Sequence, residues 1–104
     1  GYRAPEQENN KKMNYKSDIY AMAVSIIELW NGDIWYEGNT FKECRKEVLR
    51  GLRTIEKQHS ELGRLLRKSI NLKHSKRPNS KRFLSTLQNI ISNNHHIYKT
   101  RLHD

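Results

Sequence analysis

The apolar residues of the chain are most concentrated in one segment, from Ser17 to Trp30. Ten of its fourteen residues are apolar: Ile19, Tyr20, Ala21, Met22, Ala23, Val24, Ile26, Ile27, Leu29 and Trp30. A surface helix carries one apolar stripe, so a helix that is apolar nearly all round is expected to be buried on most of its sides. Ser17 is placed to cap this helix, and Asp18 stands in its first turn, where a negative charge suits the helix dipole.

Three later segments have apolar residues at helical spacing along one face only. We predict helices over Phe41–Leu52 with Thr40 as the cap, over Ser60–Leu72, and from Asn79 or Ser80 to about Ser92. The residues from 93 to 104 are polar and rich in His, and we expect this tail to fray. Nothing in the pattern indicates a strand, so the predicted class is all-α, with a central buried helix and about three helices around it.

Length and composition narrow the kinds of protein that fit. A chain of 104 residues is expected to form one domain. No apolar run approaches the ~20 residues of a membrane span, so no membrane partner is expected. One Cys excludes a disulfide framework and a Cys-based zinc site, and the adjacent His95 and His96 would point to different sides of a helix, so no metal site is expected. No glycosylation sequon is present, and we expect an intracellular location, in the cytoplasm or the nucleus.

Positive charge is concentrated in the later part of the chain. The formal net charge is +9, made up of −2 over residues 1–40 and +11 over residues 41–104. Such an excess favours acidic partners. The polar face of the Phe41–Leu52 helix carries Lys42, Arg45, Lys46 and Arg50, which form a candidate docking surface for an acidic protein surface. An ordinary solvated face is the alternative.

Four short segments then occur in a fixed order. They are Tyr2-Arg3-Ala4-Pro5-Glu6, Ser17-Asp18-Ile19-Tyr20-Ala21-Met22-Ala23, the loop from Gly32 to Gly38, and Ser69-Ile70-Asn71-Leu72-Lys73-His74-Ser75-Lys76-Arg77-Pro78. Their order and the helix lengths between them resemble the latter part of a eukaryotic protein kinase C-terminal lobe, from the Ala-Pro-Glu motif to the last helix. The resemblance covers residues 1–92 and implies the helical subdomain of that lobe.

Details of these segments indicate which branch the chain resembles. The Tyr-Arg pair before Ala-Pro-Glu is more like Ser/Thr kinases than Tyr kinases. Ala23 stands where the family usually has Gly, Lys73-His74 where it often has Asp-Pro, and Trp35-Tyr36 where it has a Pro-aromatic pair. These departures indicate a diverged member.

The resemblance also implies roles for particular residues. Glu6 is expected to pair with Arg77 and so tie the end of the activation segment to the helical subdomain. In members of the family, the residue equivalent to Asp18 anchors the buried helix by accepting hydrogen bonds from the catalytic loop. Because that loop is not in this sequence, we expect Asp18 to cap its own helix, to sit in water, or to meet donors from another chain. In the kinase family, the helix that corresponds to Phe41–Leu52 often docks substrates and regulators, so the resemblance implies a similar role for it here.

Phosphoryl transfer needs a phosphate cradle, a Lys, metal-binding carboxylates and a base. The five Gly residues form no Gly-rich loop, and neither His-Arg-Asp nor Asp-Phe-Gly occurs. In the family these motifs precede Ala-Pro-Glu. No catalytic, cofactor-binding or metal-binding residue is therefore expected in this chain. ATP and magnesium would enter only with an upstream kinase segment, whose parent would transfer the γ-phosphate to Ser/Thr hydroxyls.

Three functions stay open at this point. The chain resembles the C-terminal portion of a Ser/Thr kinase-like domain with a structural and docking role. One alternative is a free-standing lobe mimic that binds and inhibits a kinase or its partner. A second is a basic helical nucleic-acid module, for which no recognised motif is present. Because the later helices are too few to cover Ser17–Trp30, we expect a protein partner: the missing kinase segment, another kinase or a second copy.

Overall fold

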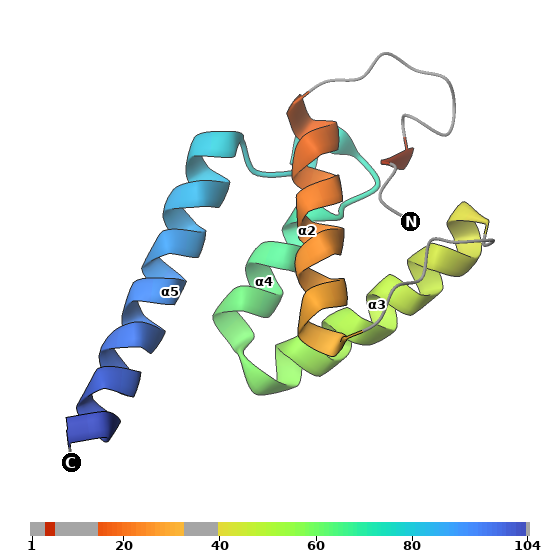
Figure 1. Ribbon diagram of the computed structural model, residues 1–104. Coiled ribbons are helices and arrows are strands. Elements are labelled where there is room, and N and C mark those ends of the chain that lie inside the picture. The colour runs from red at the N-terminus through yellow and green to blue at the C-terminus, as the bar shows by residue number, and fades with distance from the viewer. Residues whose placement is uncertain (1–3, 6–14, 33–39, 104) are drawn as a thin grey trace.

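A computed structural model describes residues 4–5, 15–32 and 40–103, with side chains placed as far as residue 93 (Figure 1). Its elements are the α-helices α2 (Tyr15–Asn31), α3 (Phe41–Gln58), α4 (Ser60–Ser69) and α5 (Ser80–His103), with a short 3-10 helix, η1 (His74–Lys76), before α5. No strand occurs among these residues, and the all-α class is confirmed.

Helix α2 is the centre of the fold. It contacts α3, α4 and α5, and in Figure 1 α3 and α4 diverge as a V from their junction, while α5 lies on the same side of α2 as α4. Its buried apolar residues are Ile19, Tyr20, Ala23, Val24 and Ile27. They join Leu52, Ile55, Leu66 and Phe83 from the other helices in one core. The predicted arrangement, a central helix with three around it, is confirmed.

The prediction that α2 is buried on most sides is confirmed, but one face of the helix is open. Tyr15 is 56% exposed, Met22 41% and Leu29 82%. These three residues are seven positions apart, so they share one face of the helix. We call them the open face of α2. Its exposure agrees with the expectation that the later helices are too few to cover this helix on every side.

The start of α2 also differs from the prediction. Ser17 is not the cap, because the helix begins at Tyr15 and Ser17 is buried within it. Tertiary contacts reach the first turn: the Arg77 guanidinium donates a hydrogen bond to the Lys16 carbonyl at 2.9 Å, and the Lys16 ammonium donates one to the Arg77 carbonyl. These bonds involve a residue far along the chain, which a local cap rule does not consider.

Helix α3 begins as predicted and ends later. The Thr40 hydroxyl accepts a hydrogen bond from the Glu43 amide at 3.2 Å, which confirms the cap. The helix then runs past Leu52 to Gln58, because the fully buried Ile55 continues the apolar stripe. A single residue, His59, separates α3 from α4: its amide donates to the Ile55 carbonyl at 2.7 Å, and its ring accepts from the Leu62 amide at 3.4 Å.

Helices α3 and α4 approach each other closely beyond this junction. A Cβ at Gly63 would lie 2.8 Å from the Cα of Glu56, so the crossing requires glycine here. One turn further on, the Arg67 guanidinium donates two hydrogen bonds to the Glu56 carboxylate, at 2.6 and 2.9 Å. Neither contact was predicted from the sequence.

The remaining helix ends show one early and one late stop. Helix α4 ends at Ser69 rather than at Leu72. Leu72 is 55% exposed, so it does not extend the buried apolar stripe of this helix. Helix α5 begins as predicted, with the Asn79 side chain accepting from the Arg82 amide at 2.8 Å. It continues past Ser92 to His103, since no Gly or Pro interrupts that segment. Among the described helices, none is long and apolar enough to cross a membrane.

Candidate functional site

Arg77 connects the segment before α5 to the start of α2. It is only 2% exposed. Its Nε donates to the Asn71 carbonyl and its Nη1 to the Lys16 carbonyl, both at 2.9 Å, and its guanidinium lies 4.9 Å from the centre of the Tyr20 ring. The planar guanidinium suits such a role because it presents donors in fixed directions and stacks on aromatic faces. Arg77 therefore fixes the loop before α5 against the start of α2.

The predicted partner of Arg77 cannot be placed in the same way. Glu6 lies outside the described residues, so the Glu6–Arg77 ion pair stays a prediction. Ala4, two residues earlier, is fully buried and belongs to the core. The Ala-Pro part of the motif is thus docked on the helical body.

Tyr20 lies between two guanidinium groups. The Arg45 Nη1 donates to the Tyr20 hydroxyl at 3.2 Å and to the Ile70 carbonyl at 2.8 Å. Burial raises the pKa of the Tyr20 phenol, while the nearby positive charges of Arg45 and Arg77 oppose that shift. The cluster of Tyr20, Arg45 and Arg77 ties α2 to α3 and to the loop that follows α4.

The candidate docking surface of α3 is therefore smaller than predicted. Arg45 does not belong to it, because its guanidinium binds Tyr20 and Ile70 inside the fold. Lys42, Lys46 and Arg50 are exposed, and Arg50 lies 3.5 Å from Glu47 of the same helix. Periodicity places Arg45 on the polar face, but it does not reveal that a long side chain can reach a buried hydroxyl.

Asp18 lies on the open face of α2. It is exposed, and it follows Tyr15 by three residues and precedes Met22 by four, which places the three on one side of the helix. The carboxylate faces the solvent in this chain, where donors from another segment can reach it. An acidic group is thus set among exposed apolar residues.

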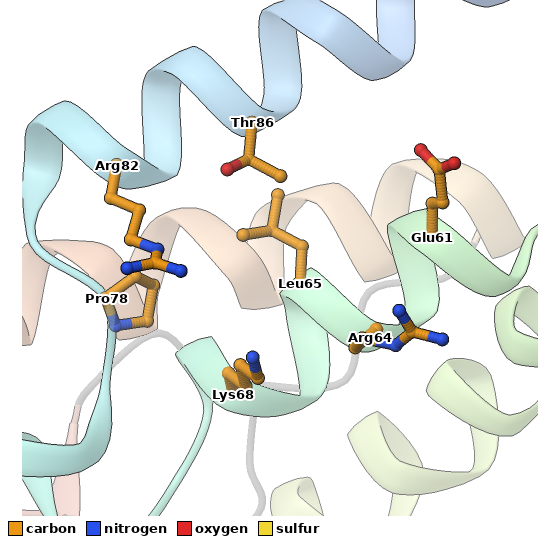
Figure 2. A pocket seen from close by; sticks show the side chains of 7 residues that line it. All are labelled: Glu61, Arg64, Leu65, Lys68, Pro78, Arg82 and Thr86. Atoms are coloured by element: carbon orange, nitrogen blue, oxygen red, sulfur yellow. The ribbon is translucent and has the colours of Figure 1, made fainter.

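A pocket between α4 and α5 has no counterpart in the predictions from sequence. Its volume is about 290 Å³, and it is lined by Glu61, Arg64, Leu65, Lys68, Pro78, Arg82 and Thr86 (Figure 2). We call it the α4–α5 pocket. The spacing of its α4 residues, i, i+3, i+4 and i+7, is a signal that sequence reading could have used. Their meeting with Arg82 depends on how α5 packs.

The family model of protein tyrosine and serine/threonine kinases matches residues 1–87. This match spans most of the chain, and the protein belongs to that family. No curated protein and no solved structure matches the chain significantly. The family assignment therefore rests on the match of the family model over residues 1–87.

Proposed function

We propose that the chain is the C-terminal helical part of a diverged Ser/Thr protein kinase-like catalytic domain. Its role there is structural and docking rather than catalytic. The family match over residues 1–87 supports the class, and the Tyr-Arg form before Ala-Pro-Glu supports the Ser/Thr type. The observation that carries the structural role is the open face of α2.

The open face has the character of an interface. Leu29, at 82% exposure, and Met22, at 41%, lie on the central helix of the fold, where apolar groups are ordinarily covered. Exposed apolar groups that gather on one face mark contact sites for other protein segments. Asp18 on the same face supplies a carboxylate that can accept hydrogen bonds from backbone amides. The occupant that fits both features is the preceding part of the same catalytic domain.

The docking role is assigned to α3. Lys42, Lys46 and Arg50 face the solvent on one helix, and cationic side chains arranged in this way attract acidic protein surfaces. Arg45 contributes indirectly, because its bonds to Tyr20 and Ile70 hold α3 in place.

The reading frame upstream of Gly1 tests the proposal first. We expect it to encode Asp-Phe-Gly and His-Arg-Asp before the Tyr-Arg-Ala-Pro-Glu segment. A frame that opens with Met directly before Gly1 would contradict the proposal and favour the free-standing lobe mimic.

A binding experiment then tests the open face. The upstream segment, expressed separately, is mixed with the 104-residue chain, and the complex is measured by sedimentation velocity. The double substitution Met22→Ser and Leu29→Ser is expected to weaken association by at least about tenfold. Leu84→Ser with Ile91→Ser removes two exposed apolar groups from α5 (50% and 57%) and is the matched control. Equal losses in the two variants would contradict the role of the open face.

A further inference from the structure

The α4–α5 pocket carries an excess of positive charge that is not neutralised within the described residues. Arg64 and Lys68 come from α4 and Arg82 from the first turn of α5, and Figure 2 shows them around the pocket with Glu61 as the single acid. All three cations are exposed. Within the described part of the chain, their side chains form no hydrogen bond or ion pair with one another or with Glu61.

A neighbouring arginine shows the contrast. Arg67 is on the same helix, and its guanidinium is held by the Glu56 carboxylate in a two-bonded ion pair. Arg45 and Arg77 likewise donate to carbonyls inside the fold. The cations of the α4–α5 pocket thus differ from Arg45, Arg67 and Arg77, whose guanidinium groups bond to other groups of the fold.

The position of Arg82 in the first turn of α5 is electrostatically unfavourable. The first turn of α5 contains Lys81 and Arg82 and no acidic residue. The amino end of a helix carries a partial positive charge, so cations there repel it, whereas a bound anion would be favoured. A bound anion would therefore relieve a repulsion that the unoccupied pocket retains.

We infer that the α4–α5 pocket binds a phosphorylated serine or threonine side chain of a peptide segment. Three cations and one carboxylate leave two positive charges, which match the −1.5 to −2 charge of a phosphomonoester near neutral pH. The guanidinium groups of Arg64 and Arg82 can each bind two phosphate oxygens, and Lys68 adds a point charge. This assignment does not depend on the function proposed above.

Size and lining favour a side chain of a peptide over larger anions. About 290 Å³ lies at the low end of ligand pockets, enough for one phosphorylated residue but small for a dinucleotide. Leu65 and Pro78 give the pocket apolar walls, where the residue next to the phosphate can pack. Glu61 adds a negative charge that repels a second anionic group, which a nucleic-acid backbone would bring.

A phosphopeptide titration tests the inference with the full chain. The probe is the fluorescein-labelled peptide Gly-Leu-phosphoserine-Leu-Gly, and binding is followed by fluorescence anisotropy. The unphosphorylated peptide is measured alongside it. We expect the phosphorylated form to bind at least about tenfold more tightly, because only it can use the three cations.

Matched charge variants locate the binding. The triple substitution Arg64→Gln, Lys68→Gln and Arg82→Gln should weaken phosphopeptide binding by at least about tenfold. A control triple, Lys57→Gln, Lys73→Gln and Lys76→Gln, removes the same charge from exposed positions elsewhere and should change it by less than about twofold. Far-UV circular dichroism verifies folding, and if the pocket triple is unfolded, the single Lys68→Gln and Arg82→Gln variants replace it.

Three results would overturn the inference. The first is equal affinity for the phosphorylated and unphosphorylated peptides. The second is an equal loss in the two triple variants, which would indicate general attraction to a basic protein. The third is displacement of the phosphopeptide by a short DNA duplex whose own affinity falls with the pocket triple, which would assign the pocket to nucleic acid instead.

Discussion

Replacing Arg77 by alanine tests the packing of the whole fold at one residue. The substitution removes two hydrogen bonds of 2.9 Å from a charged donor, to the Asn71 and Lys16 carbonyls, and the stacking on Tyr20. Hydrogen bonds to charged groups contribute about 1.5–3 kcal/mol each, and a partly desolvated cation–π contact about 1 kcal/mol. Because relaxation and water recover part of this, we expect a loss of about 3–5 kcal/mol.

Urea unfolding followed by circular dichroism measures the change. A domain of this size has a free energy of unfolding of about 5–15 kcal/mol, so the midpoint should fall steeply while the slope stays constant. Arg77→Lys keeps the charge but lacks the planar fork, and it should lose about half as much. Arg50→Ala is the control, since Arg50 is exposed and, within the described residues, pairs with Glu47 of its own helix, and it should cost less than about 0.5 kcal/mol. A loss below about 1 kcal/mol for Arg77→Ala would refute the reasoning.

Three further predictions concern other contacts. Gly63→Ala places a Cβ 2.8 Å from the Cα of Glu56, and because backbone cannot yield easily, urea unfolding should show a loss of about 1–3 kcal/mol. Burial raises the pKa of Tyr20 in the folded state. The stability that the neutral phenol contributes to the fold is therefore complete below pH 10.0 and is lost as the pH rises through the folded pKa. The wild type should therefore lose stability relative to Tyr20→Phe above about pH 10, and parallel curves would contradict this. The hydrogen bonds from Arg67 lower the pKa of Glu56. The stability that they contribute to the fold is therefore present above pH 4.5 and is lost as the pH falls through the folded pKa. Glu56→Gln should accordingly cost about 0.5–1 kcal/mol near neutral pH and nothing at low pH, which unfolding curves at both pH values check.

Much of the fold was predictable because its determinants are local. Apolar spacing located the four helices, and short-range capping chemistry located the starts of α3 at Thr40 and of α5 at Asn79. A cap depends on residues three positions apart, and a stripe on residues three or four apart, so both can be read without knowing what packs where. The segments around Ala-Pro-Glu and Arg77-Pro78 also indicated the kinase family, which the family match supports.

The helix ends and the site were harder to predict because distant residues determine them. The first turn of α2 meets Arg77, which is 61 positions away from Lys16 along the chain. Helix α3 continues to Gln58 because Ile55 finds a place in the core, and no local stop signal records that.

By itself, the sequence determined an all-α chain of the kinase family, with its apolar residues concentrated in one helix and its positive charge in the later ones. Only the tertiary structure decided which side of α2 is covered, and which cations are used internally. Arg45 and Lys46 are neighbours on one helix, yet Arg45 bonds to Tyr20 inside the fold and Lys46 faces the solvent. The physical reason is that burial and pairing depend on which groups other elements bring within reach, and the periodicity of a single helix does not contain that information.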